Sequence, residues 1–430
     1  KTQDFYAMKL RRLESHEEMY KWMLLALLWV AYFIHQGSRQ IYPSILPQIK
    51  EYFGEGSSAK MGAVMTAFAF TYGVTVLFSG LASDFLRRKW MIVFGVLTFC
   101  TGIFLSGFVA SIGLMIFTYG VLNGLGQGCY YPPASSLLGQ HFEKNRSTAF
   151  SILQTAQYLG IIVCSLFAGY IGNIPNVGGF EGWRLAFFSV GGAGIIWALV
   201  LAFLMRYSRE LMAKKSAGED AATLKDALLV MVRKPSAIIL GLVFGMNVCI
   251  DIGYKTWMPD FLQEVHGLEP ASAAFNAVIW SYIGAFIGIM IGCRITDRLA
   301  ARGRKVIRFE TTSVGFLLTA PFAVLMAFLG SDVLCYVSLF FFGFSRGVYD
   351  SSLFASLFDV VQPKYRATGM GIMLCFGFII GSVSPTVLGW IRDMLNPQYA
   401  IASLSVCCLS AVALLMAAKF FFFNKDYEES

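Results

Sequence analysis

The chain has 430 residues, of which 57% are hydrophobic, 15% aromatic and only 14% charged. Soluble globular domains carry about a quarter charged residues, so this composition excludes an ordinary soluble fold and indicates burial in a bilayer. The formal net charge of +8 would suit a nucleic-acid partner, but its distribution along the chain argues against one.

Twelve apolar stretches follow one another along the chain, and each is long enough to cross a hydrocarbon core of about 30 Å. We expect them at residues 22–46, 60–82, 90–110, 112–139, 147–172, 184–205, 236–263, 272–295, 306–329, 332–360, 367–390 and 398–423. Backbone groups in a bilayer must pair within the protein, so continuous runs of this kind predict helices rather than barrel strands. The expected fold class is an all-α membrane protein with twelve transmembrane helices.

Lysine and arginine are distributed unevenly between the connections. Of 34 such residues, 27 fall near the chain ends or in connections on the same side as the ends. Only four fall on the other side, namely Lys50, Lys60, Arg184 and Arg392. Because cytoplasmic loops of membrane proteins are enriched in these residues, the pattern predicts a multi-pass protein of the plasma (inner) membrane with both termini in the cytoplasm.

The longest connection is rich in charged residues and alanine and covers residues 206–235. We interpret it as a cytoplasmic linker between two six-helix bundles, one at residues 1–205 and the other at residues 236–430. The two parts echo each other in sequence, as the parts of a repeat-built transporter do. Arg39 and Asp251, for example, each lie eight residues before a proline.

A second echo follows the second and eighth spans, at residues 80–89 and 293–305. The first copy resembles the signature loop of the major facilitator superfamily, G-x-x-x-D-x-x-G-R-R-K, with Arg87 in place of the inner glycine. In the second copy Cys293 replaces the first glycine. The resemblance covers essentially the whole chain and implies the pseudo-symmetric fold of two six-helix bundles. It also implies a gating role at the cytoplasmic helix ends for Asp84, Arg88 and Asp297.

A narrower resemblance concerns residues 39–51, 257–264 and 363–369. They are similar to the corresponding segments of the organophosphate:phosphate antiporters and the related anion:cation symporters. In that group an arginine in the first span contacts the substrate anion, and Arg39 matches it. The antiporters carry a second arginine in the seventh span, where this chain has Asp251, and this difference argues against phosphate-ester exchange.

Charged residues inside the spans are costly, at about 2.5 kcal/mol or more each, and usually face a cavity. Asp251 and Lys255 are four residues apart, as are Arg346 and Asp350. This spacing places each pair on one helical face and predicts two ion pairs within single helices. Arg39 then remains as an excess positive charge, which suits a carboxylate held by a two-point guanidinium contact. The competing interpretation is that both pairs are structural braces and that Arg39 extends to a membrane interface.

Polar and aromatic side chains recur at helical spacing near these charges. We expect the substrate-binding residues to be Arg39, Lys255, Arg346, Tyr42, Gln127, Tyr130, Gln157, Asn247, Tyr254 and Tyr349. For proton coupling the candidates are Asp251, Asp350 and His35, and Asp251 is favoured because it occupies the position that matches Arg39.

No motif for catalysis is present. The sequence lacks a phosphate-binding P-loop and a G-x-S-x-G elbow, and all nine cysteines lie inside the expected spans without a C-x-x-C pair. We therefore expect no enzyme activity, no cofactor and no metal site. The leading hypothesis is a monomeric, proton-coupled symporter of a small organic anion such as a sugar acid. The alternatives are an organic anion/phosphate exchanger, a multidrug exporter, and a receptor or sensor built on a transporter scaffold.

Overall fold

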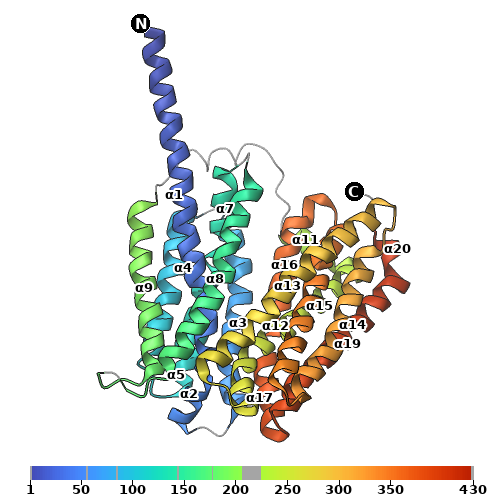
Figure 1. The fold of residues 1–430 in the computed structure, drawn as a ribbon. Coiled ribbons are helices and arrows are strands. Elements are labelled where there is room, and N and C mark those ends of the chain that lie inside the picture. Colours follow the sequence, from blue (N-terminus) through green and yellow to red (C-terminus); the bar gives the residue numbers. More distant parts are fainter. Residues whose placement is uncertain are drawn as a thin grey trace.

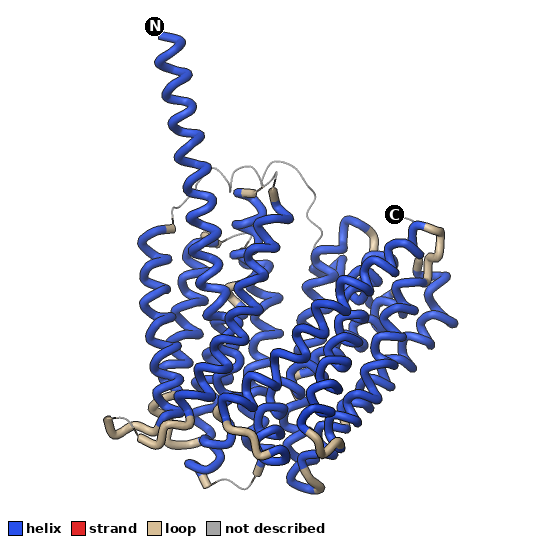
Figure 2. Tube along the Cα trace, in the orientation of Figure 1, coloured by secondary structure: helices blue, strands red, loops and turns tan. Residues whose placement is uncertain are grey.

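The computed structural model describes residues 2–54, 57–83, 86–142, 145–176, 178–205 and 224–427. Within these ranges the chain is a succession of helices joined by short turns, and Figure 2 shows no strand among them. All-helical structure is expected in a bilayer, because a helix satisfies its own backbone hydrogen bonds.

The first part of the chain forms α1 (Thr2–Ser44), α2 (Leu46–Phe53), α3 (Ser58–Ala82), α4 (Arg88–Ser106), α5 (Ile112–Met115), the π-helix η1 (Ile116–Leu122), α6 (Asn123–Gly128), α7 (Tyr131–His141), α8 (Arg146–Gly172) and α9 (Gly182–Leu204). The break between α1 and α2 comes at Ile45, between Pro43 and Pro47. Proline cannot donate to the helical ladder, which explains an interruption here.

The second part forms α11 (Leu224–Arg233), α12 (Pro235–His266), α13 (Pro270–Ala301), α14 (Ile307–Phe328), α15 (Asp332–Val360), the 3₁₀ turn η2 (Pro363–Tyr365), α16 (Arg366–Gly381), α17 (Ser384–Met394), α18 (Pro397–Ala402), α19 (Leu404–Ala417), the π-helix η3 (Ala418–Phe422) and α20 (Phe423–Asp426). The predicted linker at 206–235 is therefore helical over α11. Residues 206–223 of that linker lie outside the described residues.

The helices coincide with the twelve expected spans. Among the described residues, nine helical stretches are long and apolar enough to cross a membrane. The remaining three expected spans correspond to α1, the run from α5 to α7, and α15, and these contain Arg39, Gln127 and Arg346. Other candidate site residues, among them Asp251 and Lys255, lie on α12, which is one of the nine apolar stretches.

Figure 1 shows the helices of the first part on one side of the molecule and those of the second part on the other. Both chain ends lie at the same end of the molecule, which we call the terminal side; the other end, where α2 and α17 lie, is the opposite side. The two sets of helices converge toward the opposite side. They meet where α3 packs against α16 and α17, where α8 packs against α13, and where α1 packs against α12.

Close backbone approach and hydrogen bonds join the two sets at the opposite side. A Cβ atom on Gly62 would overlap the carbonyl oxygen of Pro385, so only glycine fits this contact. The hydroxyls of Thr66 and Thr386 lie 2.8 Å apart, and Lys50 on α2 lies 3.3 Å from Asp260 on α12. Both partners of this ion pair are largely buried. The opposite side is therefore closed.

Asp393 contributes a further contact between the two sets of helices. Its carboxylate accepts hydrogen bonds from the backbone amides of Ser58 and Ala59, at 2.8 and 3.1 Å, and from the hydroxyl of Ser57 at 3.1 Å. These groups form the N-terminus of α3, where the N-cap Ser57 makes no side-chain cap of its own. A residue of one bundle thus caps a helix of the other, and its negative charge suits the helix dipole.

We expect Asp393→Ala to weaken closure of the opposite side by about 0.5–2 kcal/mol, the usual contribution of a helix cap. The measurement is the rate at which a membrane-impermeant maleimide labels a cysteine placed at position 386, with the native Thr386 protein as background. Labelling should be faster in the Asp393→Ala protein. Glu269→Gln, which alters an exposed acid on the same side, is the control. Equal labelling rates at position 386 with and without Asp393→Ala would contradict the role of Asp393.

Candidate functional site

Asp251 on α12 lies between two cations. Its Oδ1 atom is 2.7 Å from Nζ of Lys255 on the same helix. The same oxygen is 2.5 Å from a terminal guanidinium nitrogen of Arg346 on α15. The three side chains are between 18 and 24% exposed, so water screens them only partly. Such a contact between two helices is stronger than a surface ion pair.

Asp350 is held less tightly. Its Oδ2 atom lies 3.6 Å from Nε of Arg346, and its side chain is 30% exposed. Asn247 donates a hydrogen bond of 3.2 Å to Oδ1 of Asp350, and the Tyr349 hydroxyl donates to the Asn247 carbonyl at 3.0 Å. Both expected pairs within single helices are thus present, and Arg346 in addition reaches across to Asp251 on the other helix. The four charges form one network between α12 and α15.

Arg39 on α1 is arranged differently. Its Nε atom donates a hydrogen bond of 2.6 Å to Oε1 of Gln127 on α6. The guanidinium carbon lies 4.5 Å from the ring centre of Tyr72 and 5.4 Å from that of Phe68, both on α3. One terminal nitrogen of Arg39 is buried without a hydrogen-bond partner. Within the described part of the chain, no carboxylate lies within ion-pair distance of Arg39, so its charge is uncompensated.

Gln127 is itself fixed in place. Its amide nitrogen donates to Oδ1 of Asn123 at 2.8 Å and to the hydroxyl of Ser38 at 3.1 Å, and the side chain is fully buried. These bonds orient its carbonyl oxygen toward Nε of Arg39. The guanidinium is thereby held by one edge, and its remaining N–H groups can contact an anion.

Aromatic residues that contact Arg39 or Lys255 also take part in ring contacts between the two bundles. Tyr72, which stacks on Arg39, packs edge-on against Phe378 of α16 at 4.7 Å between ring centres. On the other flank, Tyr158 of α8 packs edge-on against Tyr282 of α13 at 5.9 Å. Lys255 lies 5.7 Å from the centre of the Tyr282 ring. Sequence reasoning did not select Tyr72, Tyr282 or Phe378, since spacing alone does not show which helix faces meet.

Three of the tyrosines expected to bind substrate have hydroxyls that are already hydrogen bonded to backbone. Tyr42 donates to the carbonyl of Met61 at 2.8 Å and Tyr130 to that of Leu28 at 2.8 Å, and Tyr254 donates to the carbonyl of Ala277. All three are at most 2% exposed. Their geometry is that of braces between helices, and we leave them out of the site proposed below.

His35 and Gln157 contact other residues of the first bundle. The Nε2 atom of His35 is 3.2 Å from the backbone carbonyl of Gln127, and its ring packs against Tyr130. The histidine is fully buried, and its Nδ1 atom has no hydrogen-bond partner. Gln157 accepts a hydrogen bond of 2.9 Å from the hydroxyl of Tyr32. His35 is thus close to the Arg39 support but makes no contact with the acidic network.

Of the expected gating residues, Asp84 lies outside the described residues. Arg88 is the first residue of α4, and Asp297 is exposed near the end of α13. Both positions are at the terminal side. Their gating role stays a prediction. Among the described residues, no group of three or more histidine, cysteine, aspartate or glutamate side chains could hold a metal ion.

The net charge of the site follows from these contacts. Asp251 and Asp350 balance Lys255 and Arg346, and Arg39 adds one uncompensated positive charge beside a hydrogen-bond acceptor and two aromatic faces. A half-buried guanidinium of this kind forms its strongest contacts with carboxylates, sulfonates or phosphates.

Comparison with known proteins identifies a family. Residues 28–385 match the model of the Major Facilitator Superfamily. The chain is 23% identical over 397 residues to a "Probable sulfoacetate transporter" of Cupriavidus necator, with 86% of this chain and 87% of that protein covered. It is 24% identical to a "D-galactonate transporter" of Escherichia coli, covering 93% and 94% of the two chains.

A third relative is named an "MFS-type efflux pump" of Mycolicibacterium smegmatis, with 24% identity over 87% of this chain and 85% of that protein. Among solved structures, the fold is similar to that of a bacterial homolog of the human lysosomal transporter Spinster in an inward-facing, unoccupied conformation. The TM-score is 0.81 at 20% identity, covering 96% of this chain and 99% of the other.

Proposed function

We propose that this chain, which belongs to the major facilitator superfamily and is thus a membrane transporter and not an enzyme, carries a small organic anion in symport with protons. The substrate class is a carboxylate or sulfonate with hydroxyl groups, such as a sugar acid. The observation that carries the proposal is the uncompensated guanidinium of Arg39, held by Gln127 and stacked on Tyr72. Relatives named for sulfoacetate and galactonate support the same chemistry.

The substrate site that we propose consists of Arg39 with Gln127 and Tyr72 from one bundle, and Lys255, Arg346, Asn247 and Tyr349 from the other. An anion on Arg39 would compete with Asp251 and Asp350 for the cations of the second bundle. Binding energy could then draw the bundles together around the substrate. This is how a ligand favours one arrangement of two packed units over another.

The closed contacts at the opposite side support alternating access. In such a cycle, one side is closed while substrate exchanges with the other. With the excess of lysine and arginine near the chain ends, we infer that the terminal side faces the cytoplasm and the opposite side the exterior of the inner membrane. Asp84, Arg88 and Asp297 would then act on closure of the cytoplasmic side, and the monomer would be the functional unit.

Export of apolar drugs is a second candidate, favoured by the relative named an efflux pump. The charges of the site argue against drug export. A hydrophobic drug with a positive charge gains no favourable contact from Arg39 that would offset the cost of its desolvation. An organic anion exchanger without proton movement is the third candidate. Substrate counterflow in the absence of a pH gradient would occur in an exchanger and also in a symporter, but only a symporter concentrates substrate when a proton gradient is imposed.

The test uses purified full-length protein. A thermal-shift screen of sugar acids, sulfonates, dicarboxylates and phosphorylated sugars identifies the anion, because a ligand that binds the folded state raises its unfolding temperature. Uptake into proteoliposomes is then measured with and without an inward proton gradient. We expect accumulation of the identified anion only with the gradient. If cationic drugs stabilise the protein and no anion does, the proposal fails.

A further inference from the structure

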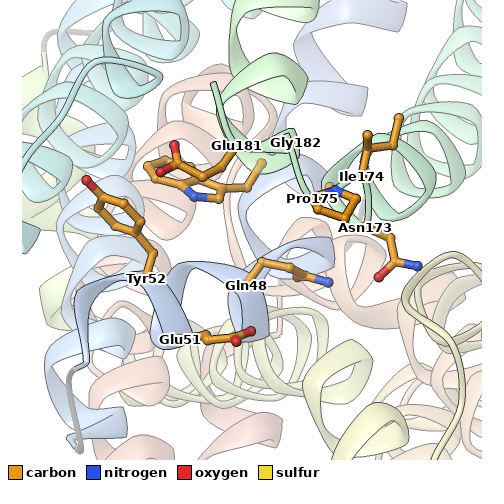
Figure 3. Close-up of a pocket in the computed structure, with 10 residues that line it drawn as sticks. Gln48, Glu51, Tyr52, Asn173, Ile174, Pro175, Glu181 and Gly182 are labelled. Carbon is orange, nitrogen blue, oxygen red and sulfur yellow. The ribbon is translucent and has the colours of Figure 1, made fainter. Parts of the chain in front are cut away.

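A cavity lies away from the charged site, at the opposite side of the first bundle. Its volume is about 420 Å³, within the range of small-molecule sites and far above that of one water molecule. Figure 3 shows Gln48, Glu51 and Tyr52 of α2 along one edge and Asn173, Pro175 and Glu181 along the other. Trp183, at the start of α9, also lines it.

The polar groups of this cavity are incompletely paired. Trp183 is only 2% exposed, yet its indole Nε1 donor has no hydrogen-bond partner. The side-chain carbonyl of Gln48 is likewise buried without a partner. A buried polar group that stays unpaired destabilises the folded protein. Glu51 lies three residues after Gln48, hence on the same face of α2, and no cation of the described chain lies within ion-pair distance of it.

The nearby Arg184 makes its ion pair with Glu181 and not with Glu51. Its Nε donates to Glu181 at 2.6 Å, and one terminal nitrogen donates to the carbonyls of Gly107 and Val109 at 2.8 and 3.1 Å. Its guanidinium also stacks on Trp183 at 4.3 Å. A backbone hydrogen bond lowers the pKa of Glu181, and Arg184 lowers it further, so this carboxylate is charged and neutralised by Arg184.

What remains is a negative charge on Glu51, an adjacent acceptor on Gln48 and an unpaired donor on Trp183. We propose that this cavity binds a primary ammonium group with an oxygen atom close by, as in ethanolamine. The ammonium has several N–H donors for Glu51 and Gln48, and the oxygen accepts from Trp183. A quaternary ammonium lacks these donors and fits the cavity less well. The group can come from a soluble amino alcohol or from the headgroup of phosphatidylethanolamine.

The experiment has a soluble arm and a lipid arm, and both use the full-length protein. Calorimetric titration measures the binding of ethanolamine and of choline to protein in detergent. Native mass spectrometry measures retention of phosphatidylethanolamine relative to phosphatidylcholine after purification from mixed vesicles. We expect ethanolamine or its lipid to bind at least about 10-fold more tightly than the choline counterpart. Binding in both arms indicates that the headgroup alone suffices, and binding only in the lipid arm indicates a bilayer source.

Glu51→Gln should weaken the preferred ligand by about 10-fold or more, because it removes a charged hydrogen bond, and Trp183→Phe by about 3- to 10-fold. Glu51 is exposed, so its substitution does not threaten folding, and Gln48→Leu replaces the tryptophan variant if that protein is unstable. Glu269→Gln is the control with unchanged binding. No amine binding in either arm, or binding insensitive to Glu51→Gln, means that the cavity holds water only and overturns the proposal.

Discussion

Arg39→Lys is expected to bind the transported anion about 10- to 150-fold more weakly than the native protein, a loss of about 1.5–3 kcal/mol. In the native protein Nε of Arg39 is engaged by Gln127 while a terminal nitrogen stays unpaired. A lysine keeps the charge but has no planar fork, so it cannot hold Gln127 and contact both oxygens of a carboxylate at once. It also loses the flat stacking surface on Tyr72.

Isothermal titration of the anion identified by the thermal-shift screen measures this effect. Arg302→Lys is the matched control, because Arg302 is exposed at the end of α13, and its affinity should equal that of the native protein. Arg39→Ala should lose at least as much affinity as Arg39→Lys. Near-normal binding by both Arg39 variants would remove this residue from the substrate site and, with it, the main support for the proposed function.

Asp350→Asn is expected to abolish uptake against a gradient while substrate counterflow continues. A symporter must protonate and release one carboxylate in each cycle, and an amide mimics the protonated form permanently. The sequence favoured Asp251 for this task, but in the structure Asp251 is held by both Lys255 and Arg346. Asp350 has a single, longer contact of 3.6 Å to Arg346 and an amide partner in Asn247. We therefore move the proton proposal to Asp350.

Asp251→Asn should behave differently from Asp350→Asn. It leaves Lys255 and Arg346 close together without the anion that separates them, and removing one partner of a largely buried ion pair is destabilising. We expect a lower unfolding temperature and weaker binding for Asp251→Asn. Proteoliposome assays of both variants, with imposed proton gradients and in counterflow, separate the two roles. If only Asp251→Asn loses concentrative uptake, Asp251 is the proton carrier; if both variants still concentrate substrate, exchange replaces symport.

The twelve spans and the identity of the unusual residues could be predicted from the amino-acid sequence alone. Long apolar runs force helices in a bilayer, and the expected stretches coincide with the observed helices. Arg39, Asp251, Lys255, Arg346 and Asp350 stood out because charge inside a span is costly. The superfamily was likewise recognisable from residues 80–89, and the match over residues 28–385 confirms it.

Contacts between side chains of different helices could not be predicted in this way. The spacing i, i+4 correctly indicated that Asp251 can reach Lys255, yet it could not show that Arg346 also reaches Asp251. Tyr130 and Tyr254 resembled substrate ligands in sequence, but their hydroxyls donate to backbone carbonyls of neighbouring helices. A polar side chain in a span needs a partner, and the sequence does not tell whether that partner is a substrate or another helix.

The sequence by itself determined which segments are helices and which of them are apolar enough to cross the bilayer. It also showed which charged side chains lie inside these spans, where their insertion is unfavourable. These properties depend on local composition and on the thickness of the hydrocarbon core. Only the tertiary structure decided that Gln127 and Tyr72 support Arg39, and that Asp393 caps α3 of the other bundle. Helical periodicity shows which face of its own helix a residue occupies, but not which other helix that face contacts. The rotation and axial position of each helix relative to its neighbours are set by packing between segments distant in sequence.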